Sequence, residues 1–362
     1  MDVFTTVIIF IFVLIFYLHL AGQYKKSNDL EIYEMDYTNN AELQKICDLK
    51  QPVLFQLPPP ISPVEPTIDQ ILNADVIHSP KNMSRNVCVK DMNDYYNINN
   101  TDTPPVVGFI SLPFSSYDIL TKTDTGSRYM TENNEIFLEE SGIKKNISKI
   151  VEPLLKPQYS AIITNKYDFH NASKNTETPL RYHLDYRRFY IVVKGKIHVK
   201  MTLYKNRNSL DAINDYDNYE FYSQLNVWKK NPILENISFL EFDVTEGNVL
   251  YVPSYWWYSI KYSNIEPTLL CSCKYNGIVN TISQFPELIK YNIHQYNSHR
   301  KYLKKIPPLA THEKENPNNE EPTAEKDGVI THEGQTAVPT DVEGIKKREF
   351  DELTGGFKQL KI

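Results

Sequence analysis

Short apolar segments separated by turn residues fill the stretch from about 180 to 280, and this spacing constrains the fold more than any other feature. Residues 188–193 are mostly apolar and end at Lys194-Gly195, after which residues 197–204 alternate between apolar and polar. Residues 243–252 resemble a turn that leads into a strand, and residues 267–275 predict a last strand. Closely spaced strands with few helices are typical of all-β barrels and sandwiches. The sequence therefore predicts a mainly β core.

Shorter elements are expected on both sides of this core. Strands are predicted at 31–37, 52–57, 106–112 and 159–164, and residues 58–105 look rich in loops. Thr38 can cap a helix over 41–48. Further helices are expected at 115–121, 134–142, 143–152 and 285–303, and Pro153 is expected to end the third of these.

Residues 3–22 form an uncharged apolar run that is long enough to cross a bilayer as a helix. The alternative is a cleaved signal peptide, which needs a basic start, a shorter apolar core and a small-residue cleavage site. The chain starts Met-Asp and lacks a clear site of that kind, so we expect an uncleaved anchor over residues 1–24. Lys25 and Lys26 follow the run, which predicts a single-pass membrane protein with a cytosolic body.

Composition bounds the rest of the chain. Glu, Pro, Asn, Thr and Lys dominate residues 306–362, which predicts a disordered tail behind a body over 30–300. The net charge of −6 offers no basic footprint for nucleic acid, so we expect no nucleic-acid partner. The four cysteines suggest no disulfide framework. Cys271 and Cys273 share one face of a strand, where they are core residues or, alternatively, a metal or redox pair.

The strongest chemical motif is the pair His183 and Asp185, which lies in the β-rich segment. In a strand, residues i and i+2 point to the same side, so both side chains could bind one metal. An imidazole and a carboxylate suit ferrous iron when other positions stay open for oxygen. The alternative is an ordinary polar pair that is hydrogen-bonded in the interior.

With this pair in its context, residues 178–277 resemble the cupin-like JmjC group, in particular hydroxylases of the factor-inhibiting type that modify Asn. The resemblance extends to roughly residues 30–300, and it is carried by Thr178-Pro179, His183-Leu-Asp185, Val192-Val-Lys-Gly195, Gly247-Asn-Val-Leu-Tyr-Val-Pro-Ser-Tyr-Trp-Trp257 and Lys274-Tyr-Asn-Gly277. It implies a double-stranded β-helix with Fe(II) and 2-oxoglutarate as cofactors. It also implies a homodimer formed through residues 283–303.

Two positions depart from the family pattern. Tyr258 stands directly after the Trp-Trp pair, where the third iron ligand is expected. It could be an unusual ligand, or it could fill the site and bond to His183 or Asp185. Ile197 stands at the family's 2-oxoglutarate lysine, which leaves Thr178 and Arg187 as candidates for the cofactor side. The histidines considered as replacement ligands are His170, His294 and His299.

Three functions therefore remain open. The favoured one is a membrane-anchored binding or scaffolding module with a degenerate iron site, a pseudoenzyme that uses a protein partner. The second is a working Fe(II)/2-oxoglutarate hydroxylase. The third is a structural membrane protein of a large DNA virus, because the many Tyr, Asn, Lys and Ile residues suggest A/T-rich codons. On that reading the membrane is a host intracellular membrane or the virion membrane.

Overall fold

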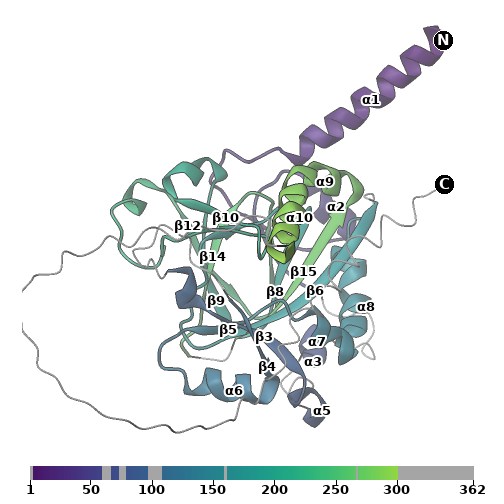
Figure 1. Ribbon diagram of the computed structural model, residues 1–362. Coiled ribbons are helices and arrows are strands. Elements are labelled where there is room, and N and C mark those ends of the chain that lie inside the picture. Colours follow the sequence, from purple (N-terminus) through teal and green to yellow (C-terminus); the bar gives the residue numbers. More distant parts are fainter. Residues whose placement is uncertain are drawn as a thin grey trace, which may run out of the picture. The chain divides into compact units, whose positions relative to one another are not determined.

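The computed structural model describes residues 3–58, 67–72, 79–96, 108–158, 161–265 and 268–300, and two β-sheets form the centre of this part (Figure 1). The nine-stranded sheet contains, in spatial order, β1 (Tyr33–Met35), β2 (Val53–Gln56), β13 (Asn248–Val252), β8 (Arg187–Lys194), β15 (Leu269–Gly277), β6 (Ile162–Ala172), β5 (Tyr129–Thr131), β3 (Asn86–Asp91) and β4 (Ile110–Pro113). The six-stranded sheet contains β10 (Ala212–Asp215), β11 (Glu220–Ser223), β7 (Arg181–Tyr182), β14 (Trp257–Tyr262), β9 (Lys196–Thr202) and β12 (Leu240–Thr245).

Helices flank the sheets, so the predicted β-rich body with flanking helices is confirmed. The helices are α1 (Val3–Gln23), α2 (Asn40–Cys47), α3 (Ile68–Ile71), α5 (Pro80–Met83), α6 (Phe114–Thr123), α7 (Glu135–Glu140), α8 (Ile143–Leu155), α9 (Ile278–Ser283) and α10 (Phe285–Arg300). Short 3-10 helices are η1 (Met92–Tyr95), η2 (Tyr204–Ser209) and η3 (Leu234–Asn236). The expected tail over 306–362 and the end of the 283–303 segment lie outside the described residues.

The hairpin between β8 and β9 shows why the local pattern predicts strands well. Gly195 adopts a φ of 80°, which glycine tolerates without steric cost, and this turn brings the chain from one sheet to the other. Along β8 the side chains alternate between two hydrophobic clusters. Phe189 and Ile191 point toward the helices, whereas Tyr190 and Val192 point into the space between the sheets.

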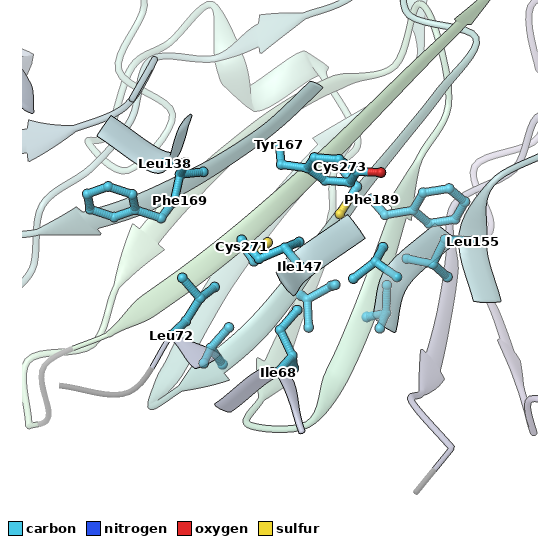
Figure 2. Packing of buried hydrophobic residues seen from close by; sticks show 14 of the residues in the cluster. Ile68, Leu72, Leu138, Ile147, Leu155, Tyr167, Phe169, Phe189, Cys271 and Cys273 are labelled. Carbon is cyan, nitrogen blue, oxygen red and sulfur yellow. The ribbon is translucent and has the colours of Figure 1, made fainter. Parts of the chain in front are cut away.

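The largest hydrophobic cluster lies between the nine-stranded sheet and the helices (Figure 2). Ile147 and Leu155 of α8 pack there with Phe189 of β8. Cys271 and Cys273 are fully buried in the same cluster, on one face of β15, so they contribute to the hydrophobic core. The second cluster lies between the two sheets and includes Tyr258, the expected third-ligand position.

The expectation that Pro153 ends the third helix is wrong, because α8 continues to Leu155 with the proline inside it. Proline removes one backbone hydrogen bond, but side chains of α2 bind the carbonyls at this helix end. Asn40 Nδ2 donates to the carbonyls of Pro153 at 3.2 Å and Lys156 at 2.8 Å, and Gln44 Nε2 donates to that of Leu155 at 3.0 Å.

The expected helix cap is also displaced by one residue. Asn39, not Thr38, has the extended backbone of the N-cap of α2, and its Oδ1 accepts from Glu42 N at 2.9 Å. Within the expected loop-rich stretch 58–105, the described residues include the strand β3 and the helices α3, α5 and η1. The alternation of β3 was hidden by the polar residues around it.

Helix α1 is 21 residues long, with a mean hydropathy of 2.6 in its most apolar window, and none of that window is buried. Length and composition therefore allow this helix to cross a membrane, as the sequence predicts. A signal sequence near an N-terminus has the same two properties.

Candidate functional site

His183 and Asp185 lie where the chain crosses between the sheets. The preceding strand, β7, belongs to the six-stranded sheet, and the following strand, β8, belongs to the nine-stranded sheet. Residues 183–186 have no regular structure, so the expectation that a strand aligns the pair is wrong. The crossover nevertheless brings them together, with His183 Nδ1 lying 3.7 Å from Asp185 Oδ2.

The His183 imidazole is buried, and one of its two nitrogens is committed. Nε2 lies 3.1 Å from the carbonyl oxygen of Val252, whereas Nδ1 has no hydrogen-bond partner. Burial, aided by the positive charge of Arg188, lowers the pKa of His183 well below its usual value despite the nearby Asp185 carboxylate. The ring is therefore neutral, with Nε2 as the donor to Val252.

Asp185 is held by two neighbours. Arg188 Nε donates to Oδ2 at 2.8 Å, and Arg188 Nη2 forms an ion pair with the same oxygen at 2.5 Å. Asn276 Nδ2 donates to Oδ1 at 3.1 Å. Burial alone would raise the pKa of Asp185, but Arg188, His183, Lys274 and the hydrogen bond from Asn276 together outweigh it, so this pKa lies below its usual range and the carboxylate is ionised.

Tyr258 occupies the expected third-ligand position on β14 and is fully buried. Its hydroxyl accepts from Arg188 Nη1 at 2.8 Å and lies 2.8 Å from the hydroxyl of Tyr190. The Tyr258 ring contacts His183 edge-on at 6.0 Å between centroids, so the expected direct bond to His183 or Asp185 is replaced by one to Arg188. Burial alone would raise the pKa of Tyr258. The positive charges of Arg188 and Arg181 act in the opposite direction, and the net shift of this pKa is downward.

Arg188 thus joins the two candidate ligand positions, and it is the residue that sequence reasoning missed. Its side chain is 15% exposed, and its guanidinium bridges the Asp185 carboxylate and the Tyr258 phenol. A signal for it was present in the sequence. Arg188, Tyr190 and Val192 alternate along β8, which places a basic side chain on the face that points between the sheets.

Arg187, the expected anion anchor, faces the other way. Its Nε donates to Gln44 Oε1 at 3.0 Å, and its Nη2 pairs with Asp48 at the end of α2. Arg187 is two residues after Asp185, and strand alternation from His183 and Asp185 predicts that its side chain points inward, which is wrong. Strand alternation begins only at residue 187, because the crossover before it is irregular.

The other two cofactor-side candidates are also buried. Ile197 is completely covered within the hydrophobic cluster between the sheets, while Lys196 and His198 lie on the opposite face of the strand. Thr178 Oγ1 accepts from the backbone N–H of Ile260 at 2.8 Å, which ties the segment to β14.

A second group of buried charges lies on the same interior side. Glu132 receives two bonds from Arg181, at 2.9 Å and 2.8 Å, and one from Lys90 at 3.0 Å. Lys90 also pairs with Glu220. These residues come from different elements, and they pair only after the sheets have formed. Local sequence patterns therefore gave no signal for them.

The remaining candidates have structural partners. His170 lies in β6, not in a loop, and its Nε2 is 2.8 Å from Ser272 Oγ. His294 on α10 pairs with Asp217 at 3.1 Å, and the side chain of His299 lies outside the described part. Trp256 is buried and donates to the carbonyl of Lys50 at 2.9 Å, which agrees with a packing role.

Among the residues that the structure describes, no group of three or more His, Cys, Asp and Glu side chains is arranged to hold a metal ion. Comparison with known proteins adds no family: no family model matches the chain, and a search of curated proteins finds no match. The function is therefore inferred from the geometry of the site.

Proposed function

We propose that this protein is a membrane-anchored binding or scaffolding module, built on a cupin/JmjC-like double-stranded β-helix that does not bind iron. The fold proposal is supported by the way the chain alternates between the sheets. Strands β7, β9, β12 and β14 belong to the six-stranded sheet, whereas β8, β13 and β15 belong to the nine-stranded sheet. The anchoring proposal is supported by the exposed apolar helix α1.

The bridge formed by Arg188 is the observation that carries the proposal. A guanidinium within 2.5 Å of Asp185 Oδ2 competes with any metal cation for that oxygen and repels the cation. Tyr258 offers a phenol already bonded to the same guanidinium, and His183 uses Nε2 to bond a backbone carbonyl. This donor set does not fit ferrous iron, which needs accessible imidazole and carboxylate ligands.

The cofactor side supports the same proposal. The buried, apolar Ile197 cannot pair with a carboxylate of 2-oxoglutarate, and Arg187 is directed toward α2. The charges of the site are balanced internally, since Arg188 neutralises Asp185. A binding or scaffolding role requires only the rigid body and its surface, and it is compatible with a closed interior of this kind.

Metal titration of the detergent-solubilised full chain tests this proposal. We expect no heat of binding when Fe(II) or Mn(II) is added under anaerobic conditions. We also expect no heat of binding for Tyr258→His alone, because the Arg188 guanidinium still pairs with the Asp185 carboxylate. The double variant Tyr258→His with Arg188→Ala is expected to bind, because it frees the carboxylate and supplies a second imidazole.

The control variants distinguish a protein that does not bind iron from a working hydroxylase. His198→Ala removes a partly exposed histidine of β9 that pairs with Asp243, and it should change nothing. Micromolar binding by the wild type that His183→Ala abolishes would refute the proposal and favour the hydroxylase. Succinate formation from 2-oxoglutarate by the wild type, absent in His183→Ala, would support that same reversal.

A further inference from the structure

Helices α9 and α10 carry an apolar stripe that the body does not cover. Its side chains are between 41% and 63% exposed. Within α9 two of them are four residues apart, and within α10 the other four follow at intervals of three or four residues, so the members on each helix share one side of it. The apolar stripe consists of Ile278, Ile282, Phe285, Ile289, Ile293 and Tyr296.

The opposite side of α10 is attached to the body. Glu287 accepts from the Tyr216 hydroxyl, and Tyr291 packs against Tyr219 with 5.4 Å between ring centroids. Gln295 Nε2 donates to the carbonyl of Asp217 at 3.0 Å. These contacts fix the rotation of the helix, so the apolar stripe is held facing away from the body.

The stripe begins beside the candidate membrane span. Helices α1 and α9 contact each other, and the two lie together in Figure 1. The hydroxyl of Tyr24, one residue after α1, donates to the carbonyl of Ser283 at the end of α9 at 2.5 Å. A helix that crosses a bilayer therefore brings α9 and the start of α10 to the surface of that bilayer.

The composition of the segment suits a membrane interface. Phe285 and Tyr296 are aromatic residues of the kind that gather at the headgroup level. Lys290 and His294 flank the stripe, and both are exposed. Helices that lie in the interface combine such an apolar face with basic residues at its sides.

We propose that the apolar stripe lies in the headgroup–acyl boundary of the bilayer that α1 enters. The body is then held by two contacts, a spanning helix and an interfacial one, which fixes its orientation on the membrane. The inference rests on the membrane anchoring proposed above. It explains why six apolar side chains stay exposed on α9 and α10, although the other side of α10 is attached to the body.

Spin labelling of the full chain in phosphatidylcholine–phosphatidylserine vesicles tests this inference. Ile293→Cys and Ile119→Cys form a matched pair, because both isoleucines are helical and 63% exposed, and Ile119 lies on α6. The accessibility of each nitroxide to oxygen and to a water-soluble nickel chelate is measured, with unmodified protein as the labelling background. We expect a several-fold higher oxygen-to-nickel ratio at position 293, at a depth of about 5–10 Å.

Flotation of the same vesicles separates the two proposals. Protein that floats but has a ratio at position 293 equal to that at 119 overturns the stripe inference and leaves the anchor intact. Protein that does not float overturns both. Protection of position 293 from both reagents also overturns the inference, because a second copy or the tail then covers the stripe, and spin–spin broadening identifies the second copy.

Discussion

Arg188 is a single cation shared by a carboxylate and a phenol in the space between two sheets. Two nitrogens of its guanidinium, Nε and Nη2, contact the Asp185 carboxylate, and the third, Nη1, donates to the Tyr258 hydroxyl. Buried charges are costly unless they are paired and hydrogen-bonded, and here each group depends on the others. The neighbouring cluster of Glu132 with Arg181 follows the same rule.

Removal of Arg188 should therefore be strongly destabilising. We expect Arg188→Ala to lower the free energy of unfolding by about 3–5 kcal/mol, because it leaves the Asp185 carboxylate buried without its partner. Arg188→Lys keeps the charge but loses the fork, so its loss should be smaller. Urea unfolding of the detergent-solubilised variants measures both, and a loss below about 1 kcal/mol for Arg188→Ala would contradict this account.

Lys50 should make the unfolding free energy depend on pH in the alkaline range. Burial, with help from the charge of Arg187, lowers the pKa of Lys50 from 10.5 to about 8. Between these values the folded state has lost the proton and the unfolded state keeps it, so stability rises with pH. The rise amounts to at most about 3 kcal/mol. The free energy of unfolding, measured at several pH values, should rise less with pH in Lys50→Met than in the wild type. Equal rises in the two proteins would show that Lys50 is not buried as described.

At the scale of elements, α2 and α8 stabilise each other across the chain. Asn40 and Gln44 project from α2 and bind the final carbonyls of α8, which would otherwise lack partners. Hydrophobic contacts of both helices with the nine-stranded sheet complete the layer. The end of α8 is therefore determined by side chains that are more than a hundred residues away in the sequence.

Replacement of Asn40 should lower the stability of the protein more than replacement of Asn39. We expect Asn40→Ala to cost about 1–3 kcal/mol, because it leaves two carbonyls in partly buried hydrogen bonds without a donor. Asn39→Ala removes only the exposed N-cap of α2 and should cost about 1 kcal/mol. Thermal unfolding of the two variants compares them directly, and an equal or larger effect of Asn39→Ala would argue against the proposed contact.

At the scale of the whole molecule, α1 is long and apolar enough to cross a membrane, and the proposal that it anchors the protein can be tested directly. If α1 is an anchor, protein isolated from the membrane fraction should retain residues 1–24, and its intact mass should include them. Deletion of residues 3–23 should move the protein to the soluble fraction, because the body does not bury this helix. A mature chain that begins after residue 22 would show instead that the segment is a signal peptide.

Much of the β-rich body could be predicted because strand signals are local. The alternation in 188–193 and 197–204, with a glycine turn between them, needs no distant partner, and β8 and β9 lie there. Helix α8 was predicted by its apolar spacing, but its continuation past Pro153 was not. The reason is that the groups that cap its end belong to α2.

The sequence by itself determined the apolar helix α1, the β-rich class of the body and three residues of the candidate site, His183, Asp185 and Tyr258, since these depend on composition, periodicity and short spacing. The tertiary structure alone decided how the site is arranged. The irregular crossover at 183–186 sets which arginine points inward, so Arg188 faces the interior and Arg187 faces α2. Pairing between charges from different strands exists only after the sheets pack, and no local pattern encodes it.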